Sequence, residues 1–210
     1  MNGDNWNCIY HPESRRLLKR VYDAKHQIAA HPWSHRNLES LSDKDIRQEM
    51  NRIEEAFRQI IGVVPRYMRP PYGEHGERVR RVLEEMEYII VLWDVDLLGH
   101  SAEPLATDSS DEYSNEKPMT GSRHRHHQDS MTSKWAEAVR GVPSTTLDRN
   151  AMMLGGIYQE ATSIWAVEYV QSLGYEVMPV ARCLGEDDPR LWYKEVSPPA
   201  DPESLPQTCR

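Results

Sequence analysis

The sequence has little of several features that would define a protein class at once. Its 210 residues include one phenylalanine and three cysteines, and 25 Lys and Arg residues are outnumbered by 33 Asp and Glu residues. The resulting net charge of −8 argues against the basic surface that a nucleic-acid groove needs. The longest apolar run, Tyr88–Trp93, is far shorter than the ~20 residues of a membrane helix. Residues 1–6 have neither the basic segment nor the apolar segment of a signal peptide. The chain as written therefore predicts an acidic protein with no membrane span and no leader.

The three cysteines, Cys8, Cys183 and Cys209, cannot all pair within one chain. Their spacing does not match a zinc ribbon. Two interpretations stay open: a reduced intracellular protein with incidental thiols, or a secretory sequence in which one cysteine has lost its partner.

Short apolar runs alternate with amphipathic helical patterns along most of the chain. Helical spacing predicts helices from Pro12 to about residue 24, from Ser42 to Gly62, over 79–86 and over 159–173. Candidate strands cover residues 27–30, 67–69, 88–93, 151–154 and 175–180. This alternation predicts an α/β fold with parallel strands, either a barrel or an open sheet.

The pattern breaks between residues 97 and 149. Residues 101–130 are rich in Ser, Asp, Glu and His and have few aliphatic side chains. Such a composition buries too little apolar surface to offset the entropy of ordering, which predicts a largely disordered insertion. We therefore expect residues 1–96 and 150–196 to be the two parts of one domain, 97–149 an insertion and 197–210 a tail.

Three successive predicted strand ends carry side chains suited to chemistry. His31-Pro-Trp-Ser-His35 spaces two imidazoles so that both could bind one metal ion, although loop histidines also serve as caps or surface groups. Arg69-Pro-Pro-Tyr-Gly73 places an arginine at a rigid turn, where it could equally be solvated. Trp93-Asp-Val-Asp96 adds carboxylates, which could simply cap a strand. Because parallel strands end at one rim, the three motifs together predict a site there.

These motifs, in this order, resemble those of the polysaccharide deacetylases with a NodB homology domain, carbohydrate esterase family four. Segments 2–6, 27–38, 67–73 and 183–193 look like those of fungal chitin deacetylases. The resemblance implies an incomplete, distorted (β/α) barrel of the α/β class. It also implies metal-dependent hydrolysis of the N-acetyl C–N bonds of chitin or a related polysaccharide. Members of the family are typically secreted or associated with the cell wall.

The resemblance assigns roles by position. His31 and His35 match the two histidines that hold a divalent metal together with an aspartate; zinc is the expected metal and cobalt the alternative. Arg69 matches the arginine that orients the general base. The backbone N–H of Tyr72 matches an oxyanion donor, and the Tyr72 and Trp93 side chains match substrate-binding positions.

Several parts of the family pattern have no counterpart in this sequence. The first motif, an Asp-Asp strand end with the metal aspartate and the general base, would precede Met1, so we expect the third protein ligand and the first strands to be missing. The family is Phe-rich there, which fits the single phenylalanine. Asp96 is a remnant of the fourth motif, whose second aspartate is replaced by Gly99. Gly155 replaces the acid histidine of the fifth motif. The family counterpart of Cys183 often pairs with a cysteine upstream of the first motif.

Three hypotheses about function remain. The complete gene product could retain deacetylase activity, with this chain as a fragment of it. The protein could instead be an inactive sugar-binding or scaffold pseudoenzyme, since loss of a general acid or base typically costs about 10²–10⁴-fold in rate. The histidine-rich tract 123–127 could bind metal independently of sugars, although its composition favours a solvated segment.

Overall fold

The computed structural model describes residues 1–93, 95–96, 154–155 and 167–209. They fall into two compact units, one made of residues 1–92 and 178–210 and the other of residues 93–177. The predicted insertion, its histidine-rich tract and Gly99 lie outside the described residues, so the division at 97–149 stays a prediction.

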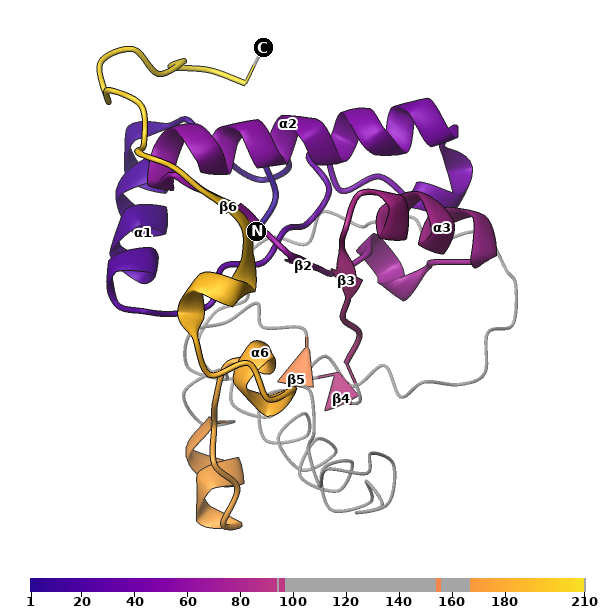
Figure 1. The fold of residues 1–210 in the computed structure, drawn as a ribbon, viewed down its shortest axis with the longest axis vertical. Coiled ribbons are helices and arrows are strands. Elements are labelled where there is room, and N and C mark those ends of the chain that lie inside the picture. Colours follow the sequence, from indigo (N-terminus) through magenta and orange to yellow (C-terminus); the bar gives the residue numbers. More distant parts are fainter. Residues whose placement is uncertain (94, 97–153, 156–166, 210) are drawn as a thin grey trace, which may run out of the picture. The chain divides into compact units, whose positions relative to one another are not determined.

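Three amphipathic helices give the first unit its framework, and all three were predicted from the sequence: α1 (Pro12–Asp23), α2 (Asp43–Ile61) and α3 (Glu77–Glu85). Helix α2 packs against both of the others, with α1 near its C-terminal part and α3 near its N-terminal part (Figure 1). The bounds of α2 follow from its caps. The Ser42 side chain accepts a hydrogen bond from the Asp45 N–H, and Gly62 ends the helix at φ +74°.

Short parallel strands lie side by side in the order in which their motifs follow one another in the sequence. Strand β2 (Tyr67–Met68) pairs in parallel with β3 (Ile89–Ile90), and Ala30 forms a parallel bridge with Met68. The Ala30 N–H donates to the Tyr67 carbonyl at 2.8 Å. The predicted segments 67–69 and 88–93 thus contain strands that are shorter than predicted, and the predicted segment 27–30 contributes only the bridge at Ala30. Ile89 and Ile90 are half-buried.

The last part of the chain returns to the first unit as an antiparallel strand. Strand β6 (Tyr193–Val196), which follows the 3₁₀ helix η3 (Pro189–Trp192), pairs with β1 (Val63–Pro65). The predicted strand 175–180 was wrong: residues 175–179 have no regular structure and helix α6 (Val180–Cys183) follows. Pro179 precedes α6 at φ −58°, and its missing N–H and fixed φ suit the start of a helix better than a strand.

The core of the first unit lies around the inward faces of the helices. Its fully buried side chains include Leu18, Leu38, Ile46, Met50, Ile53, Phe57, Val79, Val82 and Leu83. Leu205 joins this core, and a disulfide links Cys8 to Cys209, 201 positions along the chain. Residues 197–209 are therefore fastened to the unit. Cys183 lies outside this bond.

The described part of the second unit is small. Strand β4 (Val95–Asp96) pairs in parallel with β5 (Leu154–Gly155), and Asp96 stands opposite Gly155. Residues 167–172 are helical and a turn follows at Gly174, where φ is +88°. This agrees with the C-terminal part of the predicted helix 159–173.

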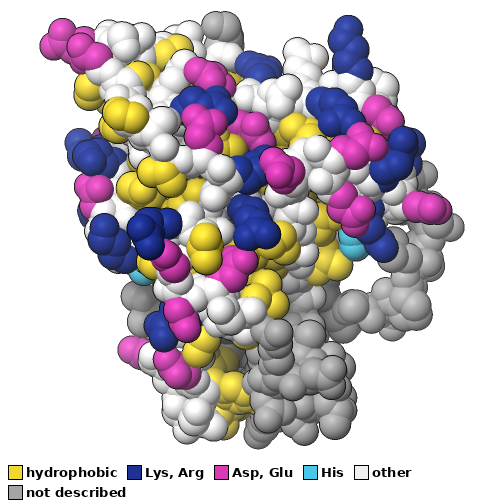
Figure 2. Space-filling model, viewed as in Figure 1, with side chains coloured by type: hydrophobic (Ala, Val, Ile, Leu, Met, Phe, Trp, Pro, Cys, Tyr) yellow, Lys and Arg dark blue, Asp and Glu magenta, His cyan; other side chains and the backbone are white. Residues whose placement is uncertain are grey.

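Acidic and basic side chains are interspersed over the face shown in Figure 2. Many form ion pairs between elements: Arg58 and Glu195 approach to 3.0 Å, and Arg78 and Asp43 to 2.9 Å. None of the helices within the described ranges has the length and apolar character needed to cross a bilayer.

Candidate functional site

Two imidazoles meet at the carboxyl end of the parallel strands. His31 directly follows Ala30, the residue that bridges to β2, and His35 follows one turn later. The two ring centroids lie 4.8 Å apart in an edge-to-face arrangement. His35 has φ +58°, a conformation that residues other than glycine adopt at an energetic cost. The surrounding contacts must therefore hold His35 in place beside His31.

Hydrogen bonding fixes the orientation of the first imidazole. His31 Nδ1–H donates to the Arg69 carbonyl oxygen at 2.6 Å, which leaves Nε2 with its lone pair available. Burial lowers the pKa of His31 to about 4. Burial also lowers the pKa of His35. Both rings are therefore neutral at pH 7, which is the form of imidazole that coordinates metals.

The arginine-containing turn lies next to this pair. The Arg69 N–H donates to the Ala30 carbonyl at 3.0 Å, and the following 3₁₀ helix η2 (Pro71–Gly73) carries Tyr72 at φ +60°. Tyr72 is 60% exposed, and its ring meets the His35 ring edge-on, with 5.0 Å between centroids. The structure thus brings His31, His35, the Arg69 backbone and Tyr72 together, and leaves Tyr72 largely open to solvent.

The two motif-bearing loops are tied to each other. Asn37, at the N-cap of the 3₁₀ helix η1 (Leu38–Ser40), donates from its amide to Glu74. The Glu39 carboxylate accepts from the Gly76 N–H, and Arg78 donates to the Glu39 carbonyl at 3.0 Å. These bonds hold the loop after His35 against the loop after Tyr72.

Sequence reasoning missed Glu49, a residue of α2. Its carboxylate is buried and accepts hydrogen bonds from the Ser34 N–H at 2.7 Å and from the Ser34 hydroxyl at 2.6 Å. Ser34 precedes His35 within the histidine motif. The sequence did contain a sign of this contact. Glu49 lies beside the apolar positions Ile46 and Met50 of an amphipathic helix, where a buried charged side chain needs a partner.

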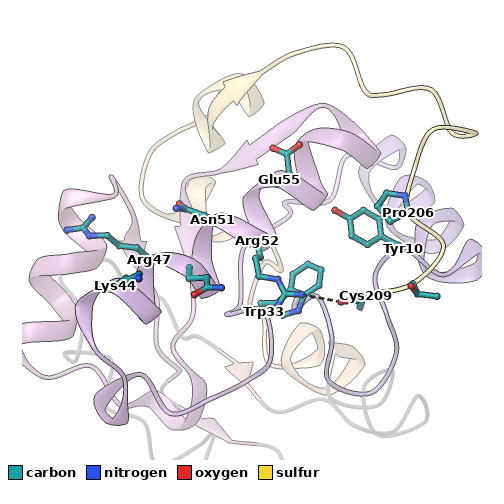
Figure 3. Close-up of a pocket in the computed structure, with 11 residues that line it drawn as sticks. Tyr10, Trp33, Lys44, Arg47, Asn51, Arg52, Glu55, Pro206 and Cys209 are labelled. Carbon is teal, nitrogen blue, oxygen red and sulfur yellow. Dashed lines mark hydrogen bonds between the residues drawn. The ribbon is translucent and has the colours of Figure 1, made fainter.

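Trp33, between the two histidines, is packed from more than one side. A Cβ atom added to Gly3 would lie 2.1 Å from the Trp33 ring, so the chain can approach this closely only with glycine at position 3. The Arg52 guanidinium lies 4.2 Å from the Trp33 ring centroid and donates to the Cys209 carbonyl at 3.2 Å (Figure 3). The indole therefore anchors the centre of the histidine loop.

A groove of about 890 Å³ lies between α2 and residues 206–209 (Figure 3). It is lined by Tyr10, Trp33, Lys44, Arg47, Gln48, Asn51, Arg52, Glu55, Pro206, Thr208 and Cys209. Neither His31 nor His35 contributes to it. The groove is thus separate from the imidazole pair and shares only Trp33 with the histidine loop.

The remaining predicted site residues belong to the second unit. Trp93 is half-buried, and Asp96 and Gly155 are partners in the β4–β5 ladder. The ladder therefore pairs the positions that the resemblance assigns to the fourth and fifth motifs. Within the described ranges, no group of three or more His, Cys, Asp or Glu side chains could hold a metal ion. The described residues therefore offer the His31 and His35 imidazoles as metal ligands, without a third protein ligand beside them.

Comparison with known proteins finds similar sequences. Residues 3–91 match the polysaccharide deacetylase family. The chain is 28% identical over 194 residues to a chitin deacetylase of Pestalotiopsis sp, covering 92% of this chain and 56% of that protein. It is also 28% identical over 199 residues to a chitin deacetylase of Colletotrichum lindemuthianum, covering 92% and 70%.

The solved structure of the Colletotrichum lindemuthianum chitin deacetylase is similar to the fold described above. The TM-score is 0.68 at 26% identity, over 92% of this chain and 76% of that one. The likeness confirms the predicted α/β class and the (β/α) barrel type. The chain spans little more than half of the Pestalotiopsis relative.

Proposed function

Given that this chain is a polysaccharide deacetylase-like protein related to the fungal chitin deacetylases, we propose that it acts on chitin or a similar N-acetylated polysaccharide. The proposed reaction is metal-dependent hydrolysis of the N-acetyl C–N bond. One observation carries the proposal: His31 and His35 face each other beside Arg69 and the exposed Tyr72 ring.

The imidazole pair fits part of a divalent metal site. His31 presents Nε2 because its Nδ1–H is bonded to the Arg69 carbonyl, an arrangement typical of metal-binding histidines. We assign zinc to His31 and His35, with cobalt as the alternative. When bound, such an ion supplies Lewis-acid chemistry toward an amide carbonyl and a water molecule. Zinc sites commonly use three or four ligands, so water, substrate or residues outside the described ranges would supply the others.

The neighbouring residues have roles that follow from their positions. The backbone N–H of Tyr72 would donate to the oxygen of the tetrahedral intermediate, where a fixed donor is most effective. Its exposed ring offers a flat apolar face to a sugar ring. Arg69 would orient the general base through its charge. We assign Trp93 to substrate binding and Asp96 to the remnant of the fourth motif.

A second candidate function is a sugar-binding pseudoenzyme. The observation that favours it is Gly155, which stands opposite Asp96 in the β4–β5 ladder and has no side chain where the family has an acid histidine. Such a protein would bind the glycan and release no acetate.

We also propose that the protein is secreted or associated with the cell wall. The support is the Cys8–Cys209 disulfide, since such bonds form and persist in oxidising compartments.

The test uses the full chain and the variants His31→Ala and His35→Ala. Zinc binding is measured by calorimetry, and acetate release is measured with chitin oligomers. We expect each variant to weaken zinc binding at least about tenfold, because each removes one of two nitrogen ligands. His26→Ala is the matched control, since His26 is exposed and lies outside the His31–His35 motif.

Acetate release that disappears in His31→Ala would support the enzyme and exclude the pseudoenzyme. Oligomer binding without acetate would support the pseudoenzyme. If deletion of residues 123–127 removed the bound zinc while His31→Ala did not, the proposed site would be wrong.

A further inference from the structure

Glu49 is the one charged residue that is buried within the described ranges, at 8% exposure. A carboxylate in such a place raises the free energy of the folded state unless hydrogen bonds satisfy it. In the part of the chain that the structure describes, both of its side-chain hydrogen bonds come from Ser34. Ser34 belongs to the loop that carries the two imidazoles, so the Glu49 carboxylate is hydrogen-bonded to the loop of the candidate site.

The geometry of the contact is bidentate. One carboxylate oxygen accepts from the Ser34 N–H at 2.7 Å and the other accepts from the Ser34 hydroxyl at 2.6 Å. Hydrogen bonds to an ionised carboxylate are stronger than those between neutral groups. Rotation of the peptide before Ser34 would break a bond and leave a buried charge unsatisfied. The contact therefore fixes the backbone immediately before His35, which is the strained residue of the loop.

Packing of α2 does not need a glutamate at this position. Its inward neighbours Ile46, Met50 and Ile53 are fully buried aliphatic side chains. An apolar residue at position 49 would extend that surface without the free-energy penalty of a buried charge. The contact with Ser34 therefore accounts for a glutamate at position 49, whereas helix packing does not.

We propose that Glu49 is a positioning residue that holds the loop from His31 to His35 so that the two imidazoles face each other. The effect that we expect on metal binding rests on the proposed function. Partners that orient metal ligands typically contribute about 10–100-fold to metal affinity.

The test compares three variants of the full chain with a matched control. Glu49→Ala removes both hydrogen bonds, and Ser34→Ala removes only the one from the hydroxyl. Glu49→Gln can keep both, because its amide oxygen accepts from the Ser34 N–H and its amide N–H donates to the Ser34 hydroxyl. Glu84→Gln, on the exposed part of α3, is the control for loss of a helix carboxylate.

Two readouts are measured on each protein. In the metal-free chain, Glu49→Ala should raise the hydrogen-exchange rate of the Ser34 and His35 amides at least about tenfold, with α3 unchanged. Its zinc affinity should fall about 10–100-fold. Ser34→Ala should lower zinc affinity by a smaller factor. Glu49→Gln should stay within about threefold of the wild type, a rescue that a purely electrostatic role of Glu49 would not give.

Wild-type exchange and zinc affinity in Glu49→Ala would overturn the proposal, as would equal losses in Glu49→Gln and Glu49→Ala. If Glu49→Ala does not fold, Ser34→Ala decides: unchanged exchange and affinity in that variant overturn the proposal. If the wild-type chain binds no zinc, the proposed function fails. The exchange rates in the metal-free protein then decide by themselves whether Glu49 holds the loop.

Discussion

Removal of the Cys8–Cys209 disulfide should strongly destabilise the first unit. The bond closes a loop of 201 positions. The chain-entropy relation for a loop of this length gives roughly 18 cal/mol/K, or about 5 kcal/mol at 25 °C, and losses measured for native disulfides are commonly about 2–5 kcal/mol. We therefore expect Cys8→Ser/Cys209→Ser to lower the free energy of unfolding by about 2–5 kcal/mol.

The measurement is urea unfolding followed by circular dichroism and tryptophan fluorescence, with and without a reducing agent. The reducing agent should lower the midpoint of the wild type to that of the double variant and leave the variant unchanged. Cys183→Ser is the control, because Cys183 lies outside the disulfide; we expect a change of less than about 1 kcal/mol. A double variant as stable as the oxidised wild type would refute the reasoning, as would peptide mapping that pairs Cys183 with either of the other cysteines.

Two further predictions concern a helix end and an ion pair. Gly62→Ala should destabilise the first unit by at least about 2 kcal/mol in urea unfolding, since φ is +74° and a Cβ would lie 2.0 Å from the Ser197 carbonyl oxygen. Gly174→Ala, at φ +88° with no atom of the described residues within 4 Å, should cost about 1 kcal/mol, and equal losses would contradict the role of the clash. Hydrogen bonds from Arg190 lower the pKa of Asp188 to about 2, so its stabilising effect should be complete above the unfolded pKa of about 4 and be lost as the pH falls toward 2. Carboxyl NMR titration should give that midpoint and Arg190→Ala should raise it, whereas a wild-type midpoint near 4 would contradict the contact.

Local patterns in the sequence were enough to predict the three long helices α1, α2 and α3. The apolar spacing of α2 and its terminal residues Ser42 and Gly62 predicted its bounds, because a helix repeats every 3.6 residues and its caps are local. The motifs also predicted that His31 and Arg69 lie at neighbouring strand ends, since parallel strands end at a common rim. The predicted strand 175–180 was wrong, because a short apolar run does not by itself specify a pairing partner.

Contacts between residues far apart in the chain were decided only by the tertiary structure. Sequence spacing does not show that the Arg69 carbonyl orients His31, that Glu49 holds Ser34, or that Cys8 pairs with Cys209. Each contact depends on how α2, the strands and the C-terminal segment pack together. The sequence by itself thus determined which residues could form the site, and packing determined which of them are held in position, because periodicity records only neighbours within a few residues.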